Sequence, residues 1–265
     1  MESYKLYNGN IELIFDKDKH IYRVGDKIIY GVTSATGILD KPALMYWAVN
    51  QAIGFLDKAL KPGLVIDELN KPKLLAEAKT IHRKKKDEAA DIGTAVHNYL
   101  ETYIKAKINW EEPPDMPVNE QVKKGIIAFV KWAKENKVQF ISSERKVYSK
   151  EHEYAGTLDM EAIVNGKLAV VDFKTSKGIY PEYFIQTAAY AKALQEETGN
   201  KYKEVWILRI PKDGTDFGYA KNSNLDFYFE SFLGCLSNYR RKMWEKANKI
   251  EEMKILINNS VKKGV

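Results

Sequence analysis

Sulfur chemistry is almost absent from this chain, because Cys235 is the only cysteine among its 265 residues. One thiol excludes an intramolecular disulfide, and it excludes a zinc ribbon or an iron–sulfur cluster whose cysteines all come from this chain. Long apolar runs are also missing: none approaches the ~20 residues of a membrane span, and the N-terminus lacks a signal-peptide pattern. We therefore expect a soluble protein of a reducing compartment that has no membrane partner.

Charge of one sign is not in large excess either. Lys and Arg number 42 against 36 Asp and Glu, which gives a net charge of +6, and 45% of the residues are hydrophobic. This composition is ordinary for a globular protein with a buried core, and the length suits one large domain or a core with extensions. The basic excess suits a polyanionic partner, but many basic proteins bind no nucleic acid. Composition alone therefore leaves the function open.

The hydrophobic pattern predicts short strands, then helices, then a mixed sheet. The expected strands cover residues 11–15, 21–24, 28–30, 140–148, 155–164, 168–174 and 205–210. The expected helices cover about 73–106 (with a break near 84–86), 119–136, 181–199 and 227–258, and residues 44–55 also have helical spacing. We expect an α/β fold with a central mixed sheet flanked by helices. Its expected parts are N-terminal strands with a helical extension (1–88), a core (89–215) and a C-terminal helix packed on the core (216–265).

One expected hairpin carries the most informative polar residues. Asn165-Gly166 between β-rich segments predicts a two-residue turn. Counting outward from the turn places Asp159 opposite Asp172, and two residues further out Thr157 faces Lys174. Side chains alternate along a strand, so these four would share one face of the sheet. The opposite face would hold Leu158, Met160, Ala162, Val164, Ala169, Val171 and Phe173.

The two facing carboxylates predict a metal site. Asp159 and Asp172, with Cβ atoms roughly 5 Å apart across a ladder, would repel each other and destabilise the sheet. A divalent cation bound between them removes that conflict, and the ammonium of Lys174 suits an anionic substrate or transition state. This combination indicates metal-assisted hydrolysis, with phosphate as the obvious substrate group. The alternative is a pair of ordinary surface residues on an exposed strand, although strands disfavour Asp.

A helix ahead of the hairpin offers a nitrogen ligand. His97 and Glu101 are four residues apart, so the carboxylate could hold the imidazole in one tautomer. Gly93 lies one turn before His97, and a glycine inside a helix costs ~1 kcal/mol relative to alanine, so it requires a reason. His97 could therefore be a metal ligand that the fold brings to the hairpin. The alternative is a surface histidine on an amphipathic helix.

Two other polar groups also have simpler explanations. Gln186 and Tyr190 are four residues apart on the next helix, where they could contact a phosphate, orient the nucleophile, or form an exposed polar pair. Lys84, Lys85 and Lys86 could follow the phosphates of a nucleic acid, although a solvated helix face is the commoner explanation for such a run.

Four motifs occur in order within about residues 90–210. They are Gly93-Thr94-x-x-His97, Gly156-Thr157-Leu158-Asp159, Asp172-Phe173-Lys174 and Gln186-x-x-x-Tyr190. Together they resemble the ordered motifs of RecB-family nucleases in the PD-(D/E)xK superfamily, and residues 32–44 resemble the front of phage exonucleases of this family. Asp172 stands where many superfamily members carry Glu. The CRISPR-associated branch carries four cysteines for an iron–sulfur cluster, which Cys235 alone cannot build.

The resemblance implies a restriction-endonuclease-like core and a role for each motif residue. His97, Asp159, Asp172 and the carbonyl of Phe173 would ligate Mg²⁺ or Mn²⁺, as one or two ions and without an iron–sulfur cluster. Asp159, Asp172 and Lys174 would form the catalytic set, in which Lys174 positions or activates the attacking water. DNA contacts or support of the site would come from Glu101, Thr157, Gln186, Tyr190, Lys84, Lys85 and Lys86.

The implied activity is hydrolysis of DNA phosphodiester bonds, starting from an end of linear single- or double-stranded DNA. The corresponding setting is phage or bacterial DNA recombination, repair or replication, in the bacterial cytosol or a phage-infected host cell, with a recombination or replication protein as a further partner. Two alternatives stay open: an endonuclease of the same superfamily, and a catalytically silent DNA-binding protein on the nuclease fold.

Overall fold

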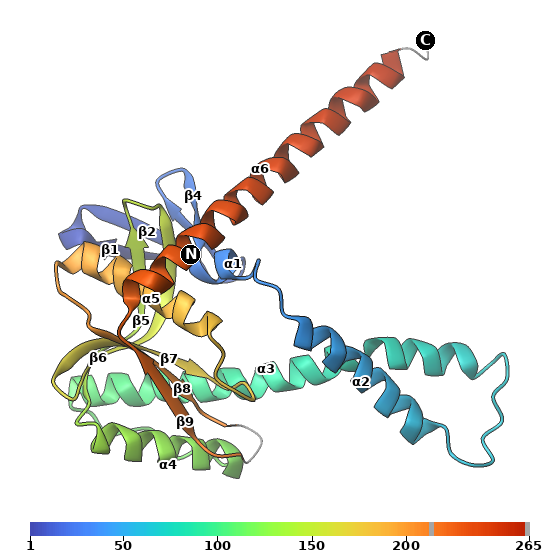
Figure 1. Ribbon diagram of the computed structural model, residues 1–265, viewed down its shortest axis with the longest axis horizontal. Helices are drawn as coiled ribbons and strands as arrows, with labels where there is room; N and C mark the ends of the chain where they lie inside the picture. Colours follow the sequence, from blue (N-terminus) through green and yellow to red (C-terminus); the bar gives the residue numbers. More distant parts are fainter. Residues whose placement is uncertain (212–214, 263–265) are drawn as a thin grey trace.

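Nine strands in the described part of the chain form one mixed sheet, and helices pack on both of its faces (Figure 1). The computed structural model describes residues 1–211 and 215–262. The strand order is β1-β2-β3-β4-β6-β7-β8-β9, and β5 pairs with β6 beside this path. The expected α/β fold with a central mixed sheet flanked by helices is therefore correct.

The central strands follow the predicted segments closely. β5 (Gln139–Ser149), β6 (Tyr154–Val164) and β7 (Lys167–Lys174) are joined by antiparallel pairing. The helix α5 (Glu182–Thr198) then leads to β8 (Glu204–Arg209), which pairs parallel to β7. A parallel pair needs such a crossover, because a tight turn can join only antiparallel strands. The predicted order of three strands, a helix and a strand is confirmed.

The N-terminal strands extend the same sheet. β2 (Ile11–Asp16), β3 (Ile21–Val24) and β4 (Lys27–Gly31) are antiparallel and match the predicted segments. β4 then runs parallel to the start of β6, with Tyr30 paired to Tyr154 and Gly31 to Ala155. Through these two pairs, the end of β4 joins the N-terminal strands to a strand that lies more than a hundred residues later in the chain.

Two strands at the ends of the sheet are not predicted by the sequence pattern. β1 (Glu2–Leu6) pairs antiparallel to β2, and β9 (Gly218–Asn222) pairs antiparallel to β8. Both have only five residues and are largely exposed or half-buried. A short edge strand with little buried surface gives a weak hydrophobic signal, so periodicity does not detect it.

Two hydrophobic clusters separate the sheet from its helices. On one face α5, α1 (Val32–Thr36) and the first turns of α6 (Leu225–Lys262) pack on the sheet. On the other face α3 (Lys71–Asn109) and α4 (Glu120–Glu135) do so. The expected break in α3 near residues 84–86 is wrong. Lys and Arg are good helix formers, and this stretch has no Gly or Pro to interrupt the helix.

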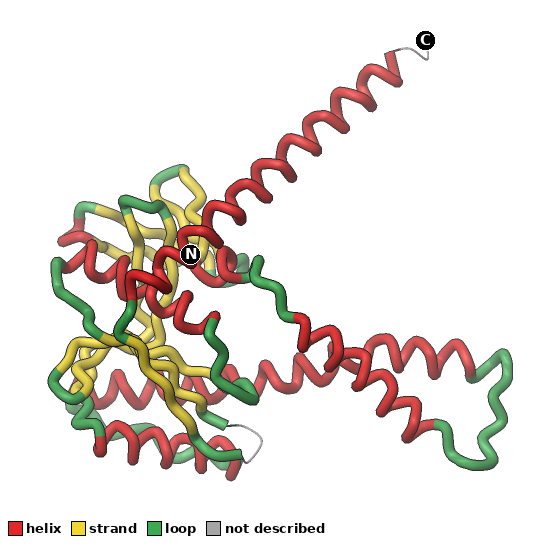
Figure 2. The backbone as a smooth tube through the Cα atoms, viewed as in Figure 1, coloured by secondary structure: helices red, strands yellow, loops and turns green. Residues whose placement is uncertain are grey.

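An arm of two helices projects from this sheet-containing body. α2 (Pro42–Ala59) packs against the N-terminal part of α3, and the loop that joins them lies at the far end of the arm (Figures 1 and 2). None of the 18 residues of α2 is buried. Within the described residues, no helix combines the length and the apolar character that crossing a membrane requires.

The hairpin between β6 and β7 has the predicted turn and register. Asn165 and Gly166 have positive φ angles of 49° and 77°, as a type I′ turn requires. The pairing runs from Val164–Lys167 to Met160–Val171, as counted from the turn.

The hairpin ladder ends one pair before the two aspartates. Beyond it the alternation of faces breaks, because Leu158 belongs to the cluster under α5 while Met160 belongs to the cluster under α3. The expectation that both side chains share the face of Phe173 is therefore wrong at Leu158. At this point β6 has lost its pairing with β7 and stays paired only with β5, whose register passes from Ser143–Met160 to Arg145–Leu158. Irregularities of this kind redirect side chains near functional sites.

Candidate active site

One pocket collects most of the residues that the sequence singled out. It has a volume of about 480 Å³ and lies where the ends of β6 and β7 meet α3 and α5. The predicted residues on its wall are His97, Thr157, Asp159, Asp172, Phe173, Lys174, Gln186 and Tyr190. Four motifs that are spread over almost a hundred residues of sequence therefore converge on one small volume.

Asp159 is held from two sides. Its Oδ1 lies 3.5 Å from Nδ1 of His97, and its Oδ2 accepts a hydrogen bond of 2.6 Å from the backbone N–H of Phe173. The approach of α3 depends on Gly93, because a Cβ at this position would come within 2.8 Å of the Thr175 hydroxyl. The glycine inside the helix thus has a physical reason: it lets His97 reach the end of β7.

Asp172 lies on the α5 side of the pocket and is only 2% exposed. Its Oδ2 is 2.6 Å from Nζ of Lys174, and Gln186 Nε2 approaches its Oδ1 at 3.5 Å. Gln186 also accepts from Lys174 Nζ at 3.4 Å and donates to the Tyr190 hydroxyl at 2.9 Å. The pair of residues on α5 therefore orients the carboxylate and the ammonium rather than forming an exposed polar pair.

Glu144 is a site residue that the sequence analysis missed. It joins His97 and Asp159 in a group whose ligand atoms lie within 4.8 Å of one another, an arrangement that could hold a metal ion. Its backbone is left-handed, with φ at 53°, at the point of β5 next to Asp159. A non-glycine residue in this conformation is uncommon, and such strain clusters at functional sites. No sequence signal marks a left-handed glutamate inside a strand.

Burial and neighbouring charges shift the pKa values of the ionisable groups in the pocket. Burial opposes the charge on His97, but the neighbouring Asp159 outweighs it and raises the pKa of His97 to about 9. Burial raises the pKa of Asp172 to about 6, with Lys174 opposing the shift and Asp159 adding to it. Burial and the charge of Asp159 raise the pKa of Glu144 to about 7. The pocket thus crowds carboxylates that are costly to ionise together.

This donor set suits a hard divalent cation. Carboxylate oxygens and a backbone carbonyl are ligands for Mg²⁺ and Mn²⁺, and carboxylate-rich manganese sites can also include an imidazole nitrogen. Burial and, second to it, the charge of Asp159 raise the pKa of Asp172 and of Glu144, and a bound cation would oppose both effects by stabilising the ionised carboxylates. The residues present therefore fit the metal that the sequence motifs imply.

Glu101 does not hold His97. Its carboxylate pairs with Lys105 Nζ at 2.5 Å, one turn further along α3, while His97 pairs with Asp159. The expected contact within the helix is wrong, because a lysine at the same spacing competes for Glu101 and the half-buried carboxylate of Asp159 is available to the histidine.

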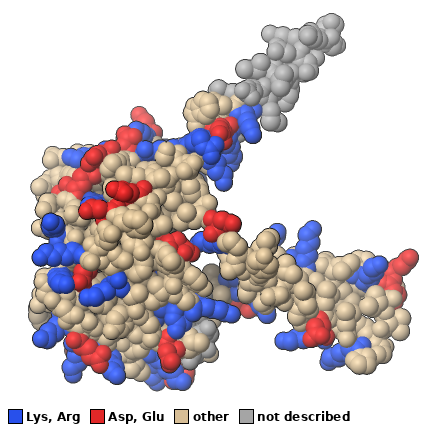
Figure 3. All heavy atoms as spheres, viewed as in Figure 1, with Lys and Arg blue, Asp and Glu red and all other residues tan. Residues whose placement is uncertain are grey.

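A larger groove of about 2300 Å³ adjoins the pocket and runs along α3. Lys85 and Lys86 line it, and so does Glu101, whereas their neighbour Lys84 does not. Lys85 also donates to Gln51 of α2 at 2.5 Å. Positive and negative side chains are interspersed over the face visible in Figure 3, so no single-sign surface marks a nucleic-acid site there.

Changing His97 to alanine is expected to weaken metal binding. The Mg²⁺ or Mn²⁺ concentration for half-maximal activity should rise about 10- to 100-fold, the usual loss when a metal site is weakened. Below pH 9 the cation competes with a proton on His97, so in the wild type this concentration should fall as the pH rises toward 9.

Calorimetric metal titration at several pH values measures both effects, and the variant should show a flatter pH dependence. An unchanged metal titration would return His97 to the role of a surface histidine. His82, which lies nearer the N-terminal end of the same helix and outside the small pocket, supplies the control substitution to alanine.

Comparison with known proteins gives only distant likenesses. No protein-family model and no curated protein matches the sequence. An alkaline exonuclease from Laribacter hongkongensis has 10% identity and a TM-score of 0.36, over 60% of this chain and 85% of that one. The same enzyme, LHK-Exo, in complex with dAMP has 12% identity and a TM-score of 0.37, over 64% and 91%. An exonuclease candidate from Eubacterium rectale has 18% identity and a TM-score of 0.41, over 60% and 68%.

Likenesses of this size establish no shared function. A function for this chain has to come from the residues of its own pocket.

Proposed function

We propose that the chain is a metal-dependent DNA exonuclease of the PD-(D/E)xK type, which hydrolyses phosphodiester bonds in phage or bacterial DNA recombination, repair or replication. One observation carries this proposal: His97, Asp159, Asp172 and Lys174 line a single pocket. Residues 89–215 would form the nuclease core between the extension (1–88) and the C-terminal helix (216–265), with 212–214 and 263–265 outside the described residues. A recombination or replication protein would be a further partner.

The metal would be held by His97, Asp159, Asp172 and the carbonyl of Phe173, with Glu144 as an additional carboxylate. When bound, Mg²⁺ or Mn²⁺ supplies a Lewis acid that polarises the phosphate and lowers the pKa of a water molecule. The N–H of Phe173 fixes one oxygen of Asp159 at 2.6 Å, so the other oxygen is left for His97 and the ligand set.

Lys174 would act on the substrate side of the same pocket. Its ammonium is 2.6 Å from Asp172 and 3.4 Å from Gln186, and it lies over the ring of Tyr183 at 4.9 Å from the centroid. These contacts keep a positive charge beside the carboxylates, where it can hold the attacking water and stabilise the charge that develops on the phosphate. Asp172 and Gln186 prevent the lysine from swinging into solvent.

The proposed activity is tested with end-labelled linear DNA and covalently closed circles. We expect Mg²⁺-dependent, progressive degradation of linear single- or double-stranded DNA, and we expect closed circles of the same sequence to survive. The groove that runs along α3 beside the pocket has room for a DNA strand on its way to the site. Gel analysis of timed samples separates the candidates: rapid cutting of closed single-stranded circles at low enzyme indicates an endonuclease, and binding without any cleavage indicates a silent DNA-binding protein.

The lysine run on α3 provides a second prediction about DNA. Replacing Lys85 and Lys86 by alanine should weaken DNA binding and reduce the slope of log affinity against log salt by up to about 2, roughly one for each phosphate that is no longer neutralised. Lys84 lies beside them but outside the groove, so Lys84→Ala is a matched control for a single change of charge on this helix.

Fluorescence anisotropy over a salt series measures this slope. If Lys84→Ala loses about half as much binding free energy and salt slope as the Lys85/Lys86 variant, only net charge matters and the groove has no special part. Turnover at saturating DNA should stay close to that of the wild type in each variant.

A further inference from the structure

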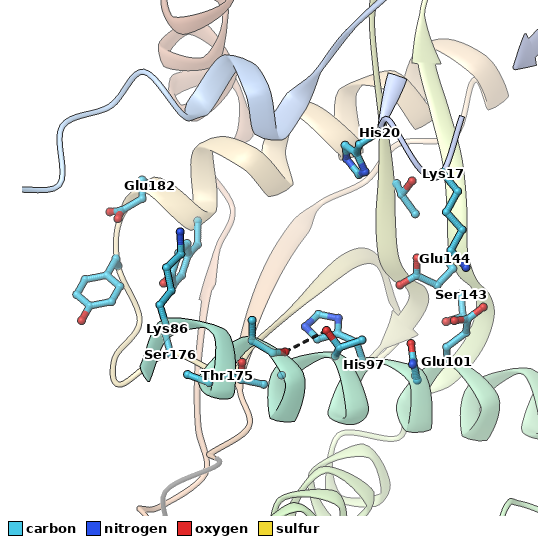
Figure 4. A pocket seen from close by; sticks show the side chains of 18 of the residues that line it. Lys17, His20, Lys86, His97, Glu101, Ser143, Glu144, Thr175, Ser176 and Glu182 are labelled. Carbon is cyan, nitrogen blue, oxygen red and sulfur yellow. Dashed lines mark hydrogen bonds between the residues drawn. The ribbon is translucent and has the colours of Figure 1, made fainter. Parts of the chain in front are cut away.

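The turn between β2 and β3 reaches the candidate active site from the N-terminal strands. Its residues 17–20 include His20, which lines both the small pocket and the larger groove, and Lys17, which lines the groove. Figure 4 shows both side chains on the wall that faces α3 and His97. Neither residue has a part in the metal site or in the motifs of the core.

The position of His20 is fixed by its neighbours although the side chain is exposed. Its backbone is left-handed, with φ at 53°, and Asp16 closes the turn by accepting a hydrogen bond of 3.1 Å from the N–H of Lys19. The imidazole stands edge-on against the rings of Phe15 and Tyr22, with centroids 5.2 and 5.9 Å away. A polar group held in this way loses little freedom when it contacts a ligand.

The turn is also fastened to the strand that carries Asp159. Tyr22 is only 2% exposed, and its hydroxyl shares a hydrogen bond of 2.9 Å with the hydroxyl of Thr157, two residues before Asp159. The predicted support role of Thr157 therefore has a concrete partner, which the hairpin register alone does not indicate. Through this bond the position of His20 is tied to the position of a metal-ligand candidate.

The other residues of the pocket indicate which chemical group of a ligand His20 would contact. The floor is rich in carboxylates, from Glu144, Asp159 and Asp172, and its metal and Lys174 would attract the scissile phosphate. The rest of the strand then needs hydrogen-bond donors on the opposite wall. An imidazole N–H and an ammonium are suitable donors for phosphate oxygens, and such contacts fix the register of a nucleic acid.

We propose that the β2–β3 turn is a DNA-contacting element, in which His20 binds a backbone phosphate beside the scissile one and Lys17 binds a phosphate further along the groove. The inference rests on the proposed nuclease function, and it assigns the N-terminal strands a part in substrate binding. The strand would lie between α3 and this turn. His20 is a positioning residue, since it acts on the alignment of the strand rather than on the reacting bond.

Steady-state kinetics of turn variants test this assignment. We expect His20→Ala to raise KM for a single-stranded oligonucleotide about tenfold and to change kcat less than threefold, and Lys17→Ala to reduce the salt slope of binding by about 1. His20→Asn should recover most of the loss, because asparagine tolerates a left-handed backbone and offers a donor. Lys19→Ala is the matched control, because Lys19 lies in the same turn but lines neither the pocket nor the groove.

Metal titration and thermal unfolding complete the experiment. The metal affinity of His20→Ala should equal that of the wild type, and its unfolding midpoint should fall by only a few degrees, because two ring contacts of an exposed side chain are lost. The inference is overturned if KM and the salt slope stay unchanged while the wild type cleaves DNA, or if metal affinity falls in parallel with KM. If the wild type neither cleaves nor binds DNA, the proposed function itself is wrong, which is a distinguishable result.

Discussion

Replacing Asp172 by asparagine is expected to abolish Mg²⁺-dependent cleavage without unfolding the protein. The carboxylate is buried, lies 2.6 Å from Lys174 and faces a pocket that already contains Asp159. The amide has nearly the same shape but cannot supply the negative charge that a divalent cation requires. Because metal assistance contributes several kcal/mol to such reactions, turnover should fall on the order of 10³-fold or more.

Thermal unfolding with and without Mg²⁺ separates loss of the metal from loss of the fold. A bound ion raises the midpoint of the wild type, and the rise should disappear in Asp172→Asn. Asp226→Asn is the control: Asp226 lies on α6, is exposed and pairs with Lys192 of α5, and this variant should keep both activity and the metal-dependent rise. Full Mg²⁺-dependent turnover by purified Asp172→Asn would falsify the assignment of the site.

Replacing Lys174 by methionine should also remove most of the activity, but by a different route. We expect turnover to fall by about 10²–10⁴-fold, the usual contribution of a positioned proton-transfer group, while metal affinity stays within a few-fold of the wild type. Lys174 is not one of the proposed metal ligands, and its ammonium lies in the pocket beside Asp172 and Gln186, where it would meet the water and the phosphate. Methionine keeps most of the length of the side chain and removes its charge.

Calorimetry and single-turnover kinetics together measure this separation. Lys167→Met is the matched control, because Lys167 lies at the other end of β7, where it pairs with Glu204. A variant at Lys174 with weakened metal binding and a near-normal rate at saturating metal would contradict the proposed role and make the lysine a support of the ligand set.

The parts of the fold that sequence predicts well depend on local signals. Asn165-Gly166 specifies a turn through its two positive φ angles, and the register of five residue pairs follows from it. Gly93 inside a helix indicates a close approach, which the structure explains by the Thr175 hydroxyl. These features need only the backbone preferences of neighbouring residues, and for that reason the order of the amino acids is enough to predict them.

The parts that sequence does not predict depend on distant contacts. Glu144 reaches the pocket through a left-handed backbone in a strand, and His97 pairs with Asp159 rather than with its helical neighbour Glu101. The position of His20 at the pocket depends on the hydrogen bond between Tyr22 and Thr157, which lies 135 residues further along the chain. The periodicity of hydrophobic residues does not predict these long-range side-chain contacts, because they depend on how the whole sheet packs.

The parallel pairing of β4 with β6 has a consequence for the timing of folding. Tyr30 leaves the ribosome long before its partner Tyr154, by roughly 6–25 s at translation rates of ~5–20 residues per second. During that interval the edge of β4 that will pair with β6 has no neighbouring strand. An unpaired edge of this kind can pair with the wrong strand. The nascent chain also cannot complete its pocket until β6, β7 and α5 have emerged. The proposed nuclease would therefore stay inert at least until α5 has emerged, and the closing of this long loop would be a slow step in its folding.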